Sequence, residues 1–316
     1  MKNKAFKYRI YPNQEQSTQL AKTFGCVRFI YNYCLNYQET NHSSGGKYIS
    51  RNKMNDLCNN TLKGVYPFLR EVDKFALTNA IFHLDDAYDR MFKHLGKHPR
   101  FKLKHKSRKS YTTNFTNGNI KVLKNRIQLP KLGKVKTNIH REIPEGWIIK
   151  SATVSQERDG TYYVSVLCEN VNETEEIVFS NSKLSESNSL GLDYKSNGLY
   201  MGSDGECCDM PHFYRESEKR LAKEQRRLSR KKPGSKRYEK QRLKVAKVNR
   251  HTANQRKDFL HKESAEKANQ YDIIASETLN MRAMANKGFH NGKATMDNGY
   301  GMFLTFLEYK LKCRGK

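Results

Sequence analysis

Two acidic residues each close a short apolar run, a pattern that can hold a divalent cation. Asp193 ends the run 189–193, just before an Asn197-Gly198 pair that is typical of a two-residue hairpin turn. Glu277 ends a second run, 271–276. Mg²⁺ prefers oxygen ligands and is commonly held by one or two carboxylates together with phosphate oxygens. If the two strands are neighbours, Asp193 and Glu277 have the chemistry for metal-assisted phosphodiester hydrolysis.

The cysteines and histidines add no second kind of site. The seven cysteines include no Cys-x-x-Cys pair, and no histidine stands at zinc spacing or beside a Ser or Cys nucleophile. We therefore expect no zinc and no other required cofactor, with Mg²⁺ possible at Asp193 and Glu277. No apolar run reaches 18 residues, so we expect a cytoplasmic protein without a membrane partner.

The charge balance points to a polyanionic partner. The 316 residues carry a net charge of +27, from 59 Lys/Arg against 32 Asp/Glu. Hydrophobic residues make up 36% and aromatic residues 11%, which favours a folded nucleic-acid binder over a disordered basic tail. Between residues 215 and 262 there are 19 Lys/Arg and five Asp/Glu, in two helical segments joined by Pro233-Gly234. A helical hairpin so one-sided indicates contact with phosphates.

A second basic stretch lies in the first half of the chain, at residues 97–110. Its cations are expected to hold nucleic-acid backbone without reading bases, and so are three arginines of the helical hairpin. They are Arg100, Lys102, Lys104, Lys106, Arg108, Lys109, Arg226, Arg227 and Arg230. Tyr111, Thr112, Thr113 and Asn114 follow, and their hydroxyl and amide groups can form hydrogen bonds with base edges.

The periodicity of apolar residues predicts helices and strands in separate blocks. Helical spacing appears at 15–39, 50–60 and 73–95, whereas residues 2–11 alternate like a strand. Five short strands are predicted between 120 and 168, which suggests a small β-barrel completed by the N-terminal strand. After Glu277, residues 280–295 are predicted to form a loop, and a final helix is expected at about 301–312.

Ten segments in the same order resemble the TnpB family of transposon-encoded, RNA-guided DNA endonucleases, relatives of the type V CRISPR effectors. They are residues 7–12, 24–32, 99–102, 110–115, 149–155, 191–193, 225–231, 253–261, 277–280 and 296–302. The resemblance implies an α+β multidomain fold with a helical recognition lobe, a wedge β-barrel and a RuvC or RNase H-like α/β domain. It implies as domains 1–12 (first barrel strand), 13–109 (helical lobe), 110–172 (barrel), 173–188 (linker) and 189–316 (RuvC-like, with a hairpin at 215–270).

The resemblance also implies partners: a guide RNA, and double-stranded target DNA beside a short flanking motif. It places Lys74, Thr78 and Asn79, together with residues 111–114, near that motif. One departure concerns the catalytic acids. Active family members continue past the region similar to 307–315 into a further strand, a zinc ribbon and a third catalytic Asp, whereas this sequence stops at Lys316. We therefore expect an incomplete RuvC-like site in which Asp193 and Glu277 are vestigial.

Three functions remain open from the sequence. The first is an RNA-guided DNA-binding protein, deficient in cleavage and acting as a transcriptional repressor at the bacterial nucleoid. The second is an RNA-guided endonuclease whose C-terminal part is missing from this chain. The third is a guide-independent basic nucleic-acid-binding protein, although no clear recognition helix of a helix-turn-helix pair is visible. Guide, target gene, flanking motif and oligomeric state are not encoded in any pattern found here.

Overall fold

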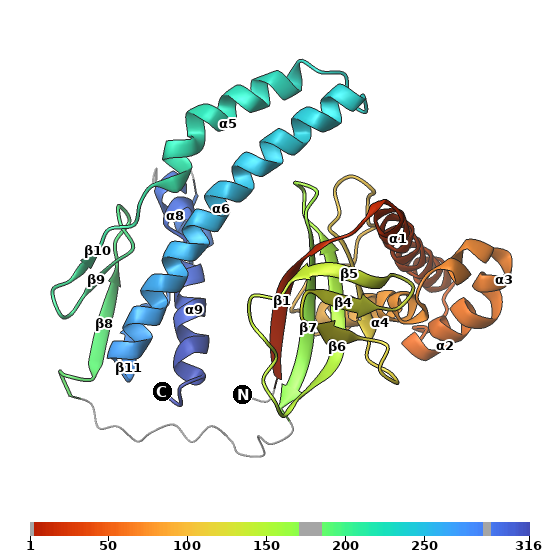
Figure 1. Cartoon of the computed structure of the whole chain (residues 1–316), viewed down its shortest axis with the longest axis horizontal. Helices are drawn as coiled ribbons and strands as arrows, with labels where there is room; N and C mark the ends of the chain where they lie inside the picture. The colour runs from red at the N-terminus through yellow and green to blue at the C-terminus, as the bar shows by residue number, and fades with distance from the viewer. Residues whose placement is uncertain (1–2, 171–184, 287–291) are drawn as a thin grey trace. The chain divides into compact units, whose positions relative to one another are not determined.

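The computed structural model describes residues 3–170, 185–286 and 292–316, and the chain divides into two compact units. The first unit is Lys2–Thr174 and the second is Glu175–Lys316, to which Met1 is also assigned (Figure 1). Most of the predicted linker, 173–188, lies outside the described residues. Each unit has its own hydrophobic core.

The first unit is built on a curled antiparallel sheet of seven strands in the order β2-β6-β7-β1-β5-β4-β3. Their bounds are β1 Asn3–Tyr11, β2 Lys109–Asn114, β3 Lys121–Leu123, β4 Arg126–Leu129, β5 Gly133–Asn138, β6 Trp147–Gln156 and β7 Tyr162–Asn170. In β1, Phe6, Tyr8 and Ile10 are buried while the residues between them face outward, as strict alternation requires. The predicted N-terminal strand therefore lies in the middle of this sheet, between β7 and β5.

Helices cover one face of this sheet. They are α1 (Gln14–Ser43), α2 (Arg51–Asp56), a π-helix (Leu57–Leu62), α3 (Lys63–Val65), a 3₁₀ helix (Pro67–Glu71) and α4 (Lys74–Phe92). The two long helices start at side-chain caps. Asn13 and Gln16 form a capping box at α1, and the Asp73 carboxylate accepts the Ala76 amide hydrogen at α4.

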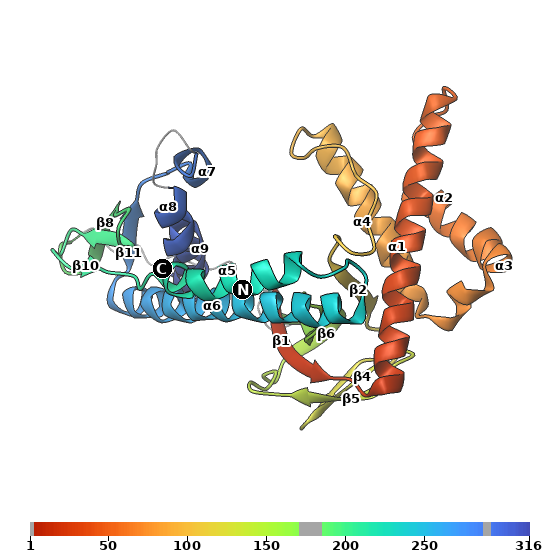
Figure 2. The ribbon, with the colours of Figure 1, turned by 90° about the horizontal axis from the view of Figure 1, so that it is seen from above.

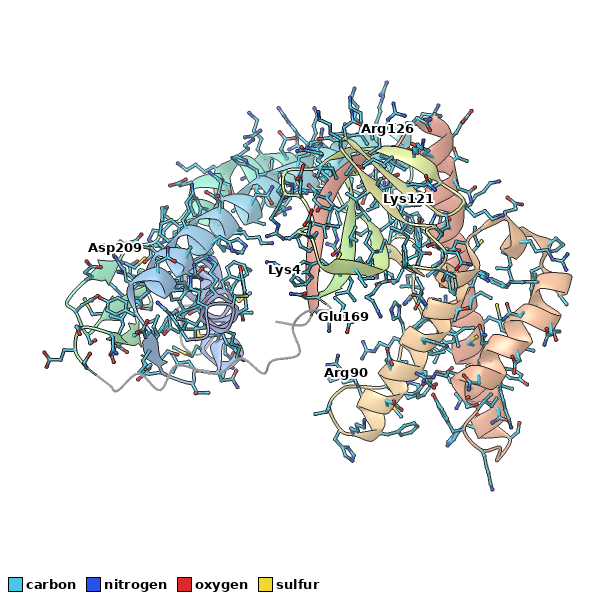
Figure 3. The ribbon with its side chains drawn as sticks, turned by 60° about the horizontal axis from the view of Figure 1, so that its bottom comes forward. Lys4, Arg90, Lys121, Arg126, Glu169 and Asp209 are labelled. Atoms are coloured by element: carbon cyan, nitrogen blue, oxygen red, sulfur yellow. The ribbon has the colours of Figure 1, made fainter. Side chains whose placement is uncertain are left out.

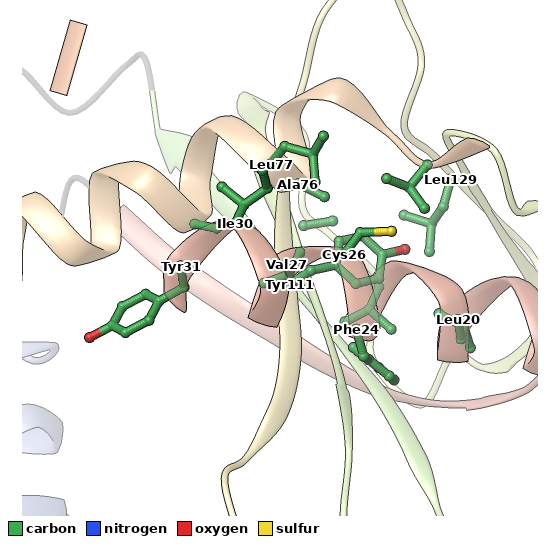
Figure 4. Close-up of a cluster of buried hydrophobic side chains, with 14 of the residues drawn as sticks. Leu20, Phe24, Cys26, Val27, Ile30, Tyr31, Ala76, Leu77, Tyr111 and Leu129 are labelled. Atoms are coloured by element: carbon green, nitrogen blue, oxygen red, sulfur yellow. The ribbon is translucent and has the colours of Figure 1, made fainter. Parts of the chain in front are cut away.

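The core of the first unit lies between α1, α4 and the sheet. Apolar residues repeat at helical spacing along α1, and Figure 4 shows Phe24, Val27 and Ile30 from this helix beside Leu77 of α4 and Tyr111 of β2. Ile30 and Leu77 are at most 1% exposed. Burying a side chain of this size contributes about 1.5–3 kcal/mol, so this interface fixes the helices on the sheet.

The second unit contains a four-stranded sheet in the order β10-β9-β8-β11. The strands are β8 (Ser189–Tyr194), β9 (Tyr200–Gly202), β10 (Cys207–Cys208) and β11 (Ile273–Ser276). The hairpin predicted from Asn197-Gly198 joins β8 to β9, and Gly198 approaches the Cys208 backbone so closely that a Cβ atom would lie 2.9 Å from its oxygen. Strand β11 pairs with β8 in parallel, which confirms that the two acid-bearing strands are neighbours.

Five helices accompany this sheet in the described residues. They are α5 (Phe213–Ser229), α6 (Lys236–Gln270), α7 (Met281–Met284), α8 (Gly292–Asn298) and α9 (Tyr300–Lys312). Helices α5 and α6 run side by side as the predicted hairpin (Figures 1 and 2). Helix α9 packs on α6 and on the sheet, where Phe303 stacks on Tyr200 of β9.

The mixed α and β architecture agrees with the prediction, but two local expectations were wrong. The predicted barrel is an open, curled sheet, because its edge strands β2 and β3 each pair with a single described strand. The predicted loop 280–295 contains α7 and the start of α8, and its residues 287–291 lie outside the described part. Glycine and asparagine made the segment read as a loop, whereas buried side chains such as Ala294 and Thr295 hold α8 in place.

Candidate functional site

Asp193 and Glu277 stand side by side at the same end of two parallel strands. Ser276 of β11 pairs with Leu192 of β8, so the acids are the next residue on each strand. Both side chains are exposed, and both line one open depression of about 480 Å³. The walls come from β8, β9 and β11, including Gly191, Gly202 and Ser203. The small residues leave room between the two carboxylates and the solvent.

The donor set of this depression suits a hydrated Mg²⁺. Two exposed carboxylates supply hard oxygen ligands, and the open side leaves positions for water or phosphate oxygens. Within the ranges that the structure describes, no group of three or more His, Cys, Asp or Glu side chains is placed to hold a metal ion. A cation bound here would therefore depend on two protein ligands and on oxygens from outside the protein.

A buried tyrosine lies within electrostatic range of both acids. Tyr300, the first residue of α9, is fully buried and packs against Tyr194, the neighbour of Asp193 in β8. Burial, followed by the negative charges of Glu277 and Asp193, raises the pKa of the Tyr300 hydroxyl to about 12. The hydroxyl thus stays protonated at neutral pH, and it makes no hydrogen bond to any described residue.

The residues predicted to read the flanking DNA motif divide into two groups. Asn79 of α4 meets β2, where its amide nitrogen donates to the Thr112 carbonyl (3.0 Å) and to Asn114 Oδ1 (3.1 Å). Thr78 donates to Asn55 at 3.0 Å, and Lys74 lies over the Phe75 ring, 5.0 Å from its centroid. The structure therefore brings Asn79, Thr112 and Asn114 together in one partly buried polar cluster.

Tyr111 and Thr113 have to be removed from that prediction. Their side chains are 4% and 0% exposed, because alternate residues of β2 face the core. Tyr111 packs against Phe24, and burial raises its pKa well above its ordinary value. Neither side chain can reach a base edge.

The basic segment is exposed except at Lys102. Arg100, Lys104, Lys106, Arg108 and Lys109 have exposed side chains, as backbone contact with nucleic acid requires. The Lys102 ammonium group instead lies over the Tyr31 ring, 3.6 Å from its centroid, and burial lowers the pKa of Lys102 to about 8.

The main chain of Lys102 is fixed as well. Its N–H donates to Asn32 Oδ1 (2.8 Å), and its carbonyl accepts from Asn32 Nδ2 (3.0 Å). Lys102 therefore fastens the segment to α1, and the prediction that it holds phosphate was wrong.

The three hairpin arginines are not equivalent. Arg226 and Arg230, one helical turn apart at the end of α5, are exposed and have no side-chain partner among the described residues. Arg227 is paired with Glu224 at 2.8 Å. Glu224 also accepts from Gln241 of α6, and these contacts lower the pKa of its carboxyl group. Arg226 and Arg230 are the two better placed to meet phosphate.

A further basic surface was not singled out from the sequence. It lies on the outward face of the seven-stranded sheet and combines cations with exposed tyrosine, as in Arg9 over the Tyr11 ring (5.0 Å) and Lys7 over Tyr163 (4.7 Å). Tyr11 pairs across strands with Lys136, which in turn pairs with Arg126 (Figure 3 labels Arg126). The alternation of Lys7, Arg9 and Tyr11 with buried residues in β1 could have revealed this surface.

Comparison with known proteins decides the family. Over 315 residues the chain is 31% identical to a protein of Streptomyces pristinaespiralis named "Putative RNA-guided DNA endonuclease", spanning 99% of this chain and 76% of the relative. This chain belongs to the TnpB family. A second relative, "Putative RNA-guided DNA endonuclease InsQ" of Escherichia coli (strain K12), is 29% identical over 283 residues, which are 89% of this chain and 67% of the relative.

Two family descriptions match parts of this TnpB-family chain. Residues 165–288 match "Probable transposase" and residues 1–47 match "Helix-turn-helix domain". In residues 3–47 the structure contains one strand and one 30-residue helix, so a helix-turn-helix pair is not formed there. A solved CRISPR-Cas12f ternary complex aligns with 96% of this chain and 70% of its own, at 12% identity and a TM-score of 0.38, too low to carry an argument.

None of the helices in the described residues has both the length and the apolar character needed to cross a membrane.

Proposed function

We propose that this TnpB-family chain is an RNA-guided DNA-binding protein whose 316 residues bind a target without cutting it, and that it acts as a transcriptional repressor. The family membership and the relatives' printed names support RNA guidance. The net charge of +27 supports a nucleic-acid partner. In this family, base pairing with the guide chooses the sequence, while the protein holds the duplex and reads a short flanking motif.

One observation supports binding without cleavage: the depression presents two carboxylates, Asp193 and Glu277, and the described residues bring no third acid to them. Two-metal hydrolysis needs ligands that hold both ions across the scissile phosphate. Two acids can hold one ion but leave a second ion poorly held. A protein that stays bound to uncut DNA would block transcription at the target, which is why we propose repression.

The first experiment tests guidance. The protein is purified with its co-purifying RNA, that RNA is sequenced, and binding to a matching DNA is measured with and without it. We expect specific binding only with RNA. Equal, sequence-specific binding by the RNA-free protein would favour the guide-independent alternative instead.

The second experiment tests cleavage. The RNA-loaded 316-residue chain is incubated with target DNA in Mg²⁺ or Mn²⁺, beside the variants Asp193→Ala and Glu277→Ala. We expect binding and reporter repression without strand cleavage, and no change in either variant. Asp209→Ala, which removes an exposed carboxylate outside the depression, is the matched control.

A second candidate function is RNA-guided DNA cleavage. The adjacency of Asp193 and Glu277 favours it, because the two strands keep their acids at the same exposed end. Guide-dependent cleavage that vanishes in Asp193→Ala and persists in Asp209→Ala would establish this function and overturn the first.

A further inference from the structure

The last turn of α8 contains three buried polar side chains beside the carboxylate depression. Thr295, Asp297 and Asn298 are 4%, 2% and 4% exposed. Polar groups at such depth are costly unless they find partners, so their contacts identify what the turn is built to hold.

Asp297 binds both helices of the α5–α6 hairpin. Its Oδ1 atom accepts the backbone N–H of Tyr214, in the first turn of α5, at 3.1 Å. The same oxygen accepts from Arg256 Nη2, in α6, at 3.0 Å. The carboxylate group is 1% exposed and the arginine side chain 20%, so solvent screens this ion pair little.

Asn298 binds the end of β8 that bears Asp193. Its Nδ2 atom donates to the Tyr194 hydroxyl at 3.1 Å and to the Ser196 carbonyl at 3.5 Å. The Tyr194 hydroxyl in turn donates to Thr295 Oγ1 at 3.4 Å. Tyr194 directly follows Asp193, and consecutive residues of α8 therefore hold the hairpin on one side and the acid-bearing strand on the other.

The buried ion pair is one bond short of its full geometry. A guanidinium and a carboxylate can form two parallel bonds, yet only Nη2 and Oδ1 meet here. Arg256 Nε and Asp297 Oδ2 are both buried without a partner among the described residues, and so is Asn298 Oδ1. A small movement of α6 against α8 could complete the pair, so the pair favours one further position of the hairpin.

We propose that Asp297 is a positioning residue that couples the α5–α6 hairpin to the Asp193 end of β8. A load on the hairpin shifts Arg256, Asp297 follows because the pair is buried, and Asn298 transmits the shift to residues 194–198. The part that concerns RNA as the load rests on the function proposed above. The mechanical link between α6 and β8 does not.

Hydrogen exchange tests the link without RNA. Segment exchange is compared between the wild-type chain and Asp297→Asn, which keeps the shape and removes the charge. We expect exchange at Tyr214 and in residues 194–198 to rise by roughly tenfold or more, since hydrogen bonds to a charged group are strong. Arg256→Lys retains a charge but not the planar fork, and should lie between the two.

The matched control is Glu218→Gln. Glu218 and Lys293 form an exposed ion pair, 2.7 Å long, that also joins α5 to α8. Exposed pairs contribute little, so its loss should change exchange in residues 194–198 by less than about twofold. If Asp297→Asn leaves that segment as protected as the control does, the coupling is absent and the inference is wrong.

A second arm adds the co-purified RNA. We expect RNA to slow exchange in α5 and α6 in both proteins, but to slow it in residues 194–198 only in the wild type. Equal protection of 194–198 in Asp297→Asn would overturn the coupling. Absence of protection in α5 and α6 of the wild type would instead contradict RNA binding by the hairpin, while the RNA-free arm still decides the link.

Discussion

Replacing Arg226 and Arg230 together with glutamine should flatten the salt dependence of RNA binding. Both side chains are exposed at the end of α5 and have no side-chain partner among the described residues. Each phosphate contact that displaces a counterion adds about 0.7–0.9 to the slope of log affinity against log salt. Losing two contacts should therefore lower the slope by about 1.4–1.8.

This change has a measurable size. Between 50 and 200 mM salt, such a slope difference makes the gap in affinity between wild type and variant shrink by about sevenfold to twelvefold. Fluorescence anisotropy with labelled, co-purified RNA at four or more salt concentrations would measure both slopes.

Arg227→Gln provides the internal control, because Arg227 is already paired with Glu224 at 2.8 Å. Its slope should change less than that of either single variant, Arg226→Gln or Arg230→Gln. If the double variant keeps the wild-type slope and affinity while its circular dichroism is unchanged, the end of α5 does not contact phosphate and the reasoning fails.

Three further predictions concern the first unit. The pKa of Lys102 is lowered from 10.5 to about 8, so the unfolded chain binds more protons between these values and stability should rise with pH there; urea unfolding at pH 7.5 and 9.5 should show a rise that Lys102→Met lacks. Thr113→Val should stabilise the protein by about 1 kcal/mol in the same assay, because it removes a buried hydroxyl without a partner among the described residues. It should not affect discrimination of the DNA flanking motif, whereas Asn114→Ala should weaken it; equal effects would contradict the assignment of Asn114. Asn32→Ala should cost about 1–3 kcal/mol, since both hydrogen bonds to the Lys102 main chain are lost.

The carboxylate pair could be predicted because the signal was local. Asp193 and Glu277 each follow a short apolar run, and two such strands in one domain have few ways to bury their side chains other than in one sheet. The hairpin α5–α6 was equally accessible, because Pro233-Gly234 interrupts an otherwise continuous helical pattern.

The errors have a common cause in contacts between distant segments. Lys102 belongs to a basic run, and only the folding of that run onto α1 places its ammonium group over Tyr31. The buried role of α8 depends on Arg256 and Tyr194, which are far from it in sequence. Tyr111 and Thr113 are different, because the alternation of β2 would have shown that both face one side, and only the buried side was misjudged.

The position of β1 has a consequence for how the first unit is made. This strand is the first element to leave the ribosome, yet its two partners in the sheet are β7 and β5. Ile10 cannot meet Tyr162 or Thr137 until those residues have been synthesised, so α1 emerges before the sheet it packs on can close. Such long-range pairing is slow and leaves an unpaired strand open to wrong partners. Nascent chains stalled before Asn170 should therefore remain sensitive to protease along β1, and protection should appear only once β7 is complete.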